Sequence, residues 1–267
     1  MLYSSVGWPI KLSNFRGVYV AVDRSLWIRS FTNDLPPWPC PTCGKGHLTP
    51  LKNKYFVEET QPSKAAKDHE AWEPDWITKR VGGFLECSFP TCRELASISG
   101  HTSKNFYQVD WDEYVDEDIF TIEHISPAPV PISLPESTPQ TIADAIRRAS
   151  SLIWASPEST TNQIRQAVES LMDEMGIPGT NAAGRPVHLH NRILEFEKTD
   201  PENGAVLLAT KWLGNTGSHV GEISFNDALD AFDMIEFVLE SKFGTTKATL
   251  MAKVAAVIAA KGPIANP

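Results

Sequence analysis

The sequence predicts an α+β protein, in which a β domain precedes an α-helical bundle. Two observations support this prediction. Runs of β-type residues lie before residue 130, whereas patterns with helical periodicity lie after it. We therefore expect a β domain at residues 1–125, a linker at residues 126–139 and a helical bundle at residues 140–267. The bundle holds more than a hundred residues, so we expect the chain from about residue 138 onward to fold alone.

Strands are predicted at residues 18–22, 54–58, 83–87 and 120–125. These runs are rich in β-branched and aromatic residues and are bounded by Gly, Pro and Asn. Residues 110–123 hold seven acids and no Lys or Arg, which indicates a solvated acidic face or loop. Residues 126–139 hold five prolines, which prevent a helix and predict an extended linker.

Six helices are predicted after the linker from the spacing of apolar residues: 141–155, 157–175, 188–198, 201–213, 225–243 and 247–260. Ser156 is an expected N-cap followed by proline at the first helical position, and Ser224 is an expected N-cap of the fifth helix. Gly176 follows the second helix and is an expected C-terminal stop.

The four cysteines form two pairs, Cys40-Pro-Thr-Cys43 and Cys87-Ser-Phe-Pro-Thr-Cys92. A C-x2-C turn brings two thiolates towards one tetrahedral ion, and Gly44 leaves room for backbone N–H groups to face the sulfurs. The second pair has four residues between its cysteines, and the two pairs, each after a β-type run, predict one structural Zn²⁺ in a zinc ribbon. Free buried cysteines and a redox pair are the alternatives. His47 could replace one thiolate, but four cysteines already complete the coordination shell.

The chain has a formal net charge of −9 and an excess of acids in both halves. A broad basic surface for nucleic acid is therefore not expected, although RNA binding through a local patch stays open. The N-terminus shows neither the basic nor the apolar stretch of a signal peptide, and no apolar run reaches the length of a membrane span. We expect a cytoplasmic protein that does not enter the membrane.

One segment of the helical part holds a motif of interest, Lys211-Trp-Leu-Gly-Asn215-Thr-Gly-Ser-His219. A helix with Arg165 and Glu169 four residues apart lies upstream, and a long amphipathic helix follows. Together these features resemble the domain-of-unknown-function 4145 family over about residues 134–244. The resemblance implies a HEPN-like helical domain, which commonly follows a zinc ribbon and occurs beside restriction enzymes and in prokaryotic phage-defence loci.

The HEPN resemblance also implies a possible ribonuclease site. In that reading His219 transfers a proton, Asn215 positions the histidine or a phosphate oxygen, and Lys211 supplies a cation. HEPN ribonucleases carry an arginine immediately before the asparagine, and this chain has Gly214 there. The alternative is structural: Asn215 caps a helix end and His219 anchors the next helix. Arg165 and Glu169 are expected to pair on their helix.

These observations lead to one favoured function and two alternatives. The favoured function is a non-catalytic interaction or regulatory module in a prokaryotic anti-phage defence or toxin-like system. We expect it to form a homodimer through the helical bundle and to contact a protein partner of that system. The alternatives are a metal-independent ribonuclease using His219 and a zinc-ribbon reader of nucleic acid.

Overall fold

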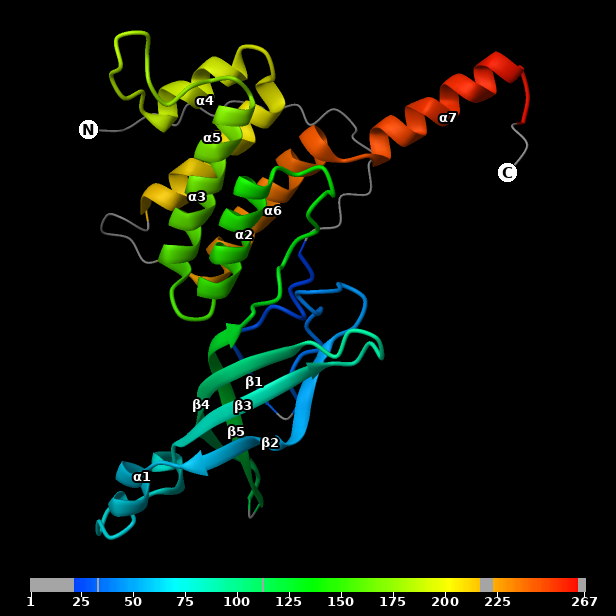
Figure 1. Cartoon of the computed structure of the whole chain (residues 1–267). Helices are drawn as coiled ribbons and strands as arrows, with labels where there is room; N and C mark the ends of the chain where they lie inside the picture. Colours follow the sequence, from blue (N-terminus) through cyan, green and yellow to red (C-terminus); the bar gives the residue numbers. More distant parts are fainter. Residues whose placement is uncertain (1–21, 33, 112, 217–222, 264–267) are drawn as a thin grey trace.

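The computed structural model describes residues 22–32, 34–111, 113–216 and 223–263, and it has an antiparallel sheet followed by a group of helices (Figure 1). The α+β class predicted from the sequence is therefore correct. The strands are β1 (Ser30–Thr32), β2 (Leu48–Glu59), β3 (Lys79–Cys87), β4 (Leu95–Asp110) and β5 (Glu113–Ser126). The helices after the sheet are α2 (Gln140–Leu152), α3 (Pro157–Glu174), α4 (Leu189–Glu197), α5 (Pro201–Thr216), α6 (Phe225–Phe243) and α7 (Thr246–Ala260).

The sheet has the strand order β1-β5-β4-β3-β2, with antiparallel neighbours throughout. Three of the predicted strands lie within β2, β3 and β5, and residues 18–21 of the fourth lie outside the described residues. β1 and β4 were not predicted. β4 has three serines and a glycine among its 16 residues, and it is held by β3 on one side and β5 on the other. Gly100 sits at a register shift where a Cβ would overlap the carbonyl oxygen of Thr121.

The acidic run 110–123 forms most of β5 and is partly paired with lysines of other strands. Lys104 of β4 lies 2.7 Å from Asp116 and 3.1 Å from Asp118, and Lys79 of β3 also pairs with Asp118. The run is thus an acidic strand face, and opposite charges on β4 and β3 offset part of its repulsion.

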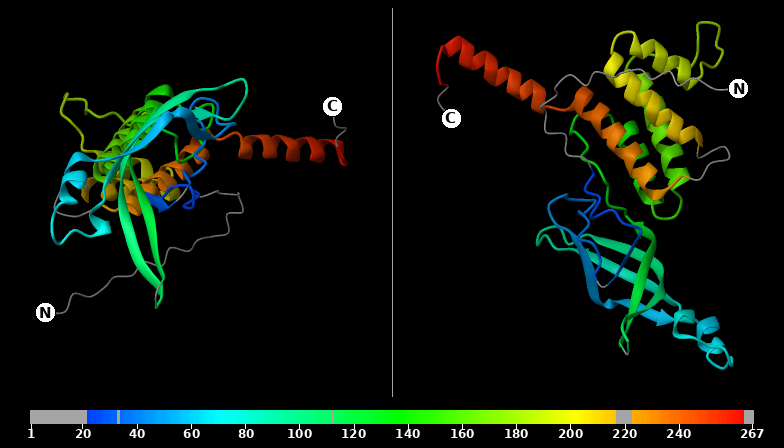
Figure 2. Two further views of the ribbon diagram at one scale, coloured as in Figure 1. Left: turned by 90° about the horizontal axis from the view of Figure 1, so that it is seen from below. Right: turned by 180° about the vertical axis from the view of Figure 1, so that it is seen from behind.

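The segment between β2 and β3 carries a short helix, α1 (Gln61–Ala66), and a 3₁₀ turn, η1 (Pro74–Trp76). The side chain of Thr60 caps α1 by accepting a hydrogen bond from the Ser63 N–H. This insertion lies at the end of the sheet that is distant from the helical part (Figures 1 and 2).

The predicted helices correspond to α2–α7, and α3 and α6 begin at the predicted N-caps. Ser156 caps α3 ahead of Pro157, and Ser224 forms a capping box with Asp227 at the start of α6. Gly176 follows α3 with φ of 74°, the left-handed conformation expected of a helix stop. Local sequence signals are therefore sufficient to define these ends.

Residues 127–139 contain neither helix nor strand and run from the sheet along α6. Ile132 is buried, the Ser133 N–H donates to Oε1 of Glu236 at 2.7 Å, and the Ser137 hydroxyl donates to the carbonyl oxygen of Phe243 at 2.5 Å. The predicted linker is extended, and it is also packed against the bundle. The division into separately folding domains stays a prediction.

A single hydrophobic core runs from the sheet into the bundle. Trp27, from the segment before β1, stacks on Trp154 after α2 with a centroid distance of 5.4 Å. Trp38 meets the same Trp154 ring edge-on at 5.7 Å and donates its indole N–H to the carbonyl oxygen of Leu26 at 2.8 Å. Burial of each aromatic ring contributes roughly 2–3 kcal/mol to the free energy of unfolding. The cluster therefore couples the stability of the sheet to that of the bundle.

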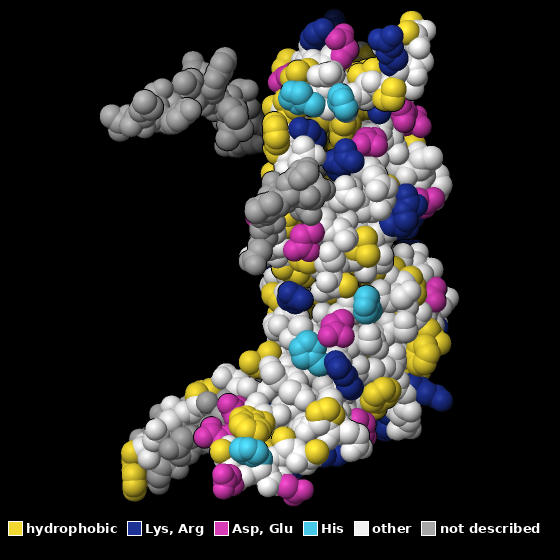
Figure 3. Space-filling model, turned by 90° about the vertical axis from the view of Figure 1, so that its left-hand side faces the viewer, with side chains coloured by type: hydrophobic (Ala, Val, Ile, Leu, Met, Phe, Trp, Pro, Cys, Tyr) yellow, Lys and Arg dark blue, Asp and Glu magenta, His cyan; other side chains and the backbone are white. Residues whose placement is uncertain are grey.

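The last helix, α7, projects away from the rest of the molecule (Figures 1 and 2). No helix in the described parts of the chain is long and apolar enough to cross a membrane. On the face drawn in Figure 3, acidic and basic side chains are interspersed along most of the long axis of the molecule, and several acidic side chains lie close together at its lower end.

Candidate metal centre

The first cysteine pair lies on a tight turn just before β2. Pro39 and His47 form an isolated β-bridge, and between them the chain reverses through Cys40, Cys43 and Gly44. The Cys40 N–H donates to the carbonyl oxygen of residue 46 at 2.8 Å, and the Gly44 N–H donates back to the carbonyl oxygen of Cys40 at 3.0 Å. Gly44 has φ of 61°, so a glycine is favoured at this point of the turn, as the sequence predicted.

The second pair lies on the turn between β3 and β4. Cys87 is the last residue of β3, and the Cys92 N–H donates to the carbonyl oxygen of Phe89 at 3.0 Å. The Ser88 N–H donates to the carbonyl oxygen of His47 at 2.9 Å, which binds this turn to the first one. β2 and β3 are paired beside these turns, with Leu48 opposite Cys87, so the sheet register places the two turns together.

Gly46 allows the two turns to approach closely, and sequence reasoning missed it. A Cβ on Gly46 would lie 2.7 Å from both Sγ of Cys87 and the backbone nitrogen of Phe89. Such a contact is too short for any side chain, so the position needs glycine. A glycine three residues after a C-x2-C turn is a signal that could have been noticed.

The four thiols converge on one point. Sγ of Cys40 lies 3.9 Å from Sγ of Cys92, Sγ of Cys43 lies 3.7 Å from Sγ of Cys87, and all four sulfurs lie within 4.8 Å of one another. Four sulfurs at about 2.3 Å from a tetrahedral ion would be about 3.8 Å apart. The geometry therefore suits a tetrahedral metal ion, and the four cysteines could hold one.

The surroundings of the thiols differ in a way that matters for metal binding. Backbone N–H groups of Gly46 and Lys45 lower the pKa of the Cys43 thiol to about 6, because they stabilise its thiolate. Burial raises the pKa of the Cys87 thiol to about 12. The positive charge of a bound metal ion would stabilise the thiolate form of a buried cysteine. The four cysteines therefore suit a metal ion as ligands. The side chain of His47 is exposed and does not belong to the cluster.

The second predicted site has only two of its three residues in the described part of the chain, because His219 lies outside it. Lys211 and Asn215 both lie on α5. Lys211 is 8% exposed, and its ammonium group lies 3.6 Å from the ring centroid of Trp212. This cation is therefore held against an aromatic face of its own helix.

Gly214 lies where α5 crosses α3. A Cβ added to Gly214 would lie 3.0 Å from Cβ of Arg165 and 3.0 Å from the carbonyl oxygen of Thr161. The absence of a side chain lets the two helices approach, so the position that resembles the arginine slot of HEPN ribonucleases is a packing position here. Arg165 pairs with Glu169 at 2.8 Å on α3, as predicted.

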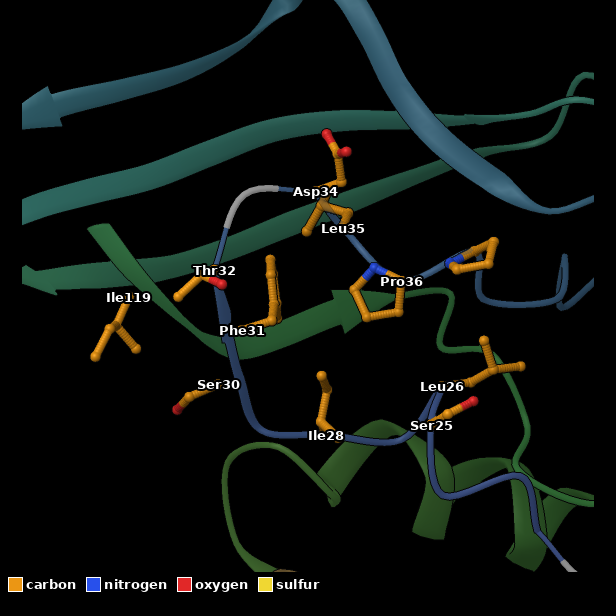
Figure 4. Close-up of a pocket in the computed structure, with 11 residues that line it drawn as sticks. Ser25, Leu26, Ile28, Ser30, Phe31, Thr32, Asp34, Leu35, Pro36 and Ile119 are labelled. Carbon is orange, nitrogen blue, oxygen red and sulfur yellow. The ribbon is translucent and has the colours of Figure 1, made fainter. Parts of the chain in front are cut away.

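An open hollow of about 800 Å³ lies beside β1 (Figure 4). Ile28, Phe31 and Leu35 are among the apolar residues that line it, and Figure 4 shows Asp34 at its upper edge and Ile119 of β5 at the left. The hollow is open and mainly apolar, so among the described residues it lacks the convergent polar groups of a catalytic site.

The fold and the site define a two-part chain, in which a sheet with a four-cysteine cluster precedes a helical domain. Residues 29–125, which include all four cysteines, match a family described as Domain of unknown function (DUF8608). Residues 147–260 match a second family, Domain of unknown function (DUF4145), which supports the resemblance inferred from the sequence and extends through α7. Neither the curated proteins nor the solved structures contain a match to this chain.

Proposed function

We propose that the four cysteines bind one structural Zn²⁺ and that the two turns carrying them act as a zinc ribbon. Thiolates favour zinc among the common cellular divalent ions, and sulfur–sulfur distances of 3.7 and 3.9 Å suit its tetrahedral shell. Four protein ligands leave no coordination position for a substrate. The ion therefore stabilises the fold and carries out no chemistry.

We propose that the whole chain is a non-catalytic interaction or regulatory module that self-associates through its HEPN-like helical part. The observation that carries this proposal is the exposure of α7. Leu250, Met251, Val254, Val257 and Ile258 are between 39% and 69% exposed. At 100° per residue these five side chains fall within about 120° of one helix face, a stripe typical of helix–helix contacts.

A second copy of this chain is the proposed occupant of that stripe. The family match that covers the bundle continues to residue 260, so α7 belongs to this domain type and is not an unrelated tail. α7 has 15 residues, and isolated helices of this length are marginal in water. Spacings of four and three residues from Leu250 to Val254 and on to Val257 form a seam that can pair with its own copy about a two-fold axis.

The ribonuclease alternative has less support from the described residues. Gly214 is needed for the contact of α5 with α3, and the nearby cation Lys211 is held over Trp212. A ribonuclease needs a preorganised cation for the charge that develops on the phosphate. The nucleic-acid reader also has less support, because a net charge of −9 opposes binding to phosphates. The proposed role in prokaryotic defence rests on the family resemblance.

Light scattering on the full chain tests self-association. We expect twice the mass of one chain for the wild type and for Ala252→Asp, because residue 252 faces away from the stripe. Val254→Asp places a charge within the stripe and should give the mass of one chain. A single-chain mass for the wild type would reject the dimer. In parallel, cleavage of RNA by the wild type in the presence of a chelator, lost in a folded His219→Ala variant, would replace the proposal with the ribonuclease.

A further inference from the structure

A second cavity, of about 550 Å³, lies where the two halves of the chain meet. Its walls come from the segment before β1, the Cys40 turn, residues 130–134, α2 and α6. Leu26, Trp27 and Ile132 supply apolar surface, whereas Asp23, Arg147 and Glu236 supply charge. Its volume is within the range of pockets that hold small organic molecules, about 300–1,000 Å³.

Glu236 is the unusual member of this lining. It is only 9% exposed, and its Oε1 accepts a hydrogen bond from the Ser133 N–H at 2.7 Å. Its Oε2 is buried and has no hydrogen-bond partner among the described residues. A buried carboxylate oxygen without a donor is costly, so such an atom next to a cavity indicates a missing donor.

The charges around the cavity favour a cationic donor. Asp23 adds a second carboxylate to that of Glu236. Arg147 is the one lining residue that carries a permanent positive charge, and its guanidinium group already lies 3.1 Å from Asp144 on the same helix. A ligand that brings its own positive charge would satisfy Oε2 and offset the two acids, whereas an anion would meet repulsion.

We propose that this cavity binds a small organic cation, with an amidinium or ammonium group at Oε2 of Glu236 and a flat apolar body against Leu26, Trp27 and Ile132. The ligand would touch the Cys40 turn and α6 at once. It therefore stabilises the junction between the metal centre and the helical part, by an amount that grows with the logarithm of one plus the ratio of its concentration to its dissociation constant.

Isothermal titration of the full chain with benzamidine tests the proposal, because benzamide is a neutral molecule of nearly the same shape. We expect saturable binding of benzamidine at millimolar concentration and at least about tenfold weaker binding of benzamide, since only the amidinium pairs with the carboxylate. Equal affinities for the two molecules, or no saturable binding of benzamidine, would overturn the proposal.

Three variants locate the site. Glu236→Gln keeps an acceptor for the Ser133 N–H and should weaken benzamidine binding at least about tenfold. Glu174→Gln removes an exposed acid at the end of α3, outside the lining, and should leave the affinity unchanged. Arg147→Ala removes a largely exposed cation and should strengthen benzamidine binding, which a merely structural effect would not do. An unchanged affinity in Glu236→Gln, with benzamidine bound, would place the ligand elsewhere and reject the assignment.

Discussion

Trp27 stacks on Trp154 with an interplanar angle of 30°, and both rings are almost completely buried, at 3% and 0% exposure. One ring comes from the segment before the sheet and the other from the turn between α2 and α3. The stack makes the sheet and the bundle parts of one core. A fragment from about residue 138 onward would expose Trp154, so we expect it to be helical but less stable than the full chain.

Trp154→Ala should lower the free energy of unfolding of the full chain by about 3–5 kcal/mol, the range for a large aromatic side chain removed from a core. Urea denaturation followed by circular dichroism measures this change. Trp111→Ala is the matched control, because Trp111 is 82% exposed and its loss should cost within about 0.5 kcal/mol. Equal losses in the two variants would contradict the role assigned to the stack.

Removal of the metal should unfold the two cysteine turns. Elemental analysis of the purified protein should give about one zinc per chain, and Cys87→Ser should abolish it and lower the melting temperature. Thr42→Ala changes an exposed residue between Cys40 and Cys43 and should keep the zinc. A purified protein that contains no metal and whose cysteine turns are nevertheless folded, with a melting temperature that added Zn²⁺ does not change, would show that the cysteines need no ion.

Glu236 should make the protein less stable as the pH rises. Burial raises the pKa of Glu236 to about 7, and the nearby carboxylates of Asp233 and Glu240 add to this effect. The unfolded chain has an ordinary glutamate pKa near 4.3, so the folded state binds the proton more tightly. Asp23 and Arg147 are the other charged residues that line the same cavity.

The sign of the effect follows from that difference in pKa. Below about pH 4 the carboxyl group is protonated in both states. As the pH rises from about 4 to 7, the unfolded state releases its proton while the folded state keeps it, so the free energy of unfolding falls. Glu236→Gln should therefore raise the free energy of unfolding by about 1–2 kcal/mol at pH 8 and change it little at pH 4. Denaturation at both pH values measures this. A variant that is less stable than the wild type at pH 8 would contradict the prediction.

Gly214→Arg, which introduces the arginine found in HEPN ribonucleases, should destabilise the protein by about 1–3 kcal/mol and should not create RNA cleavage. The cause is the contact of α5 with α3, where even a Cβ lies only 3.0 Å from Arg165 and Thr161. Ala205→Arg adds the same side chain to an exposed position of α5 and should be close to neutral. Thermal unfolding of both variants separates packing from charge, and equal melting temperatures would reject the packing role.

Much of the local structure follows from local residue patterns. The caps Ser156 and Ser224, the stop at Gly176 and the apolar spacings define α2–α7, because these signals act within a few residues. Three of the strands are likewise found from their β-branched runs. The clustering of the four cysteines is also predicted from the sequence, because two closely spaced cysteine pairs are the usual ligand pattern of one metal ion.

The tertiary structure alone decided the pairing of distant segments. β4 has a weak local pattern and is a strand because β3 and β5 supply its hydrogen bonds. Gly46 and Gly214 resemble ordinary small residues until another turn or helix lies against them. The Trp27–Trp154 stack and the cavity beside Glu236 involve residues far apart in the chain. The amino-acid sequence determined which elements form, since propensity and periodicity are local, whereas their contacts depend on packing between remote segments.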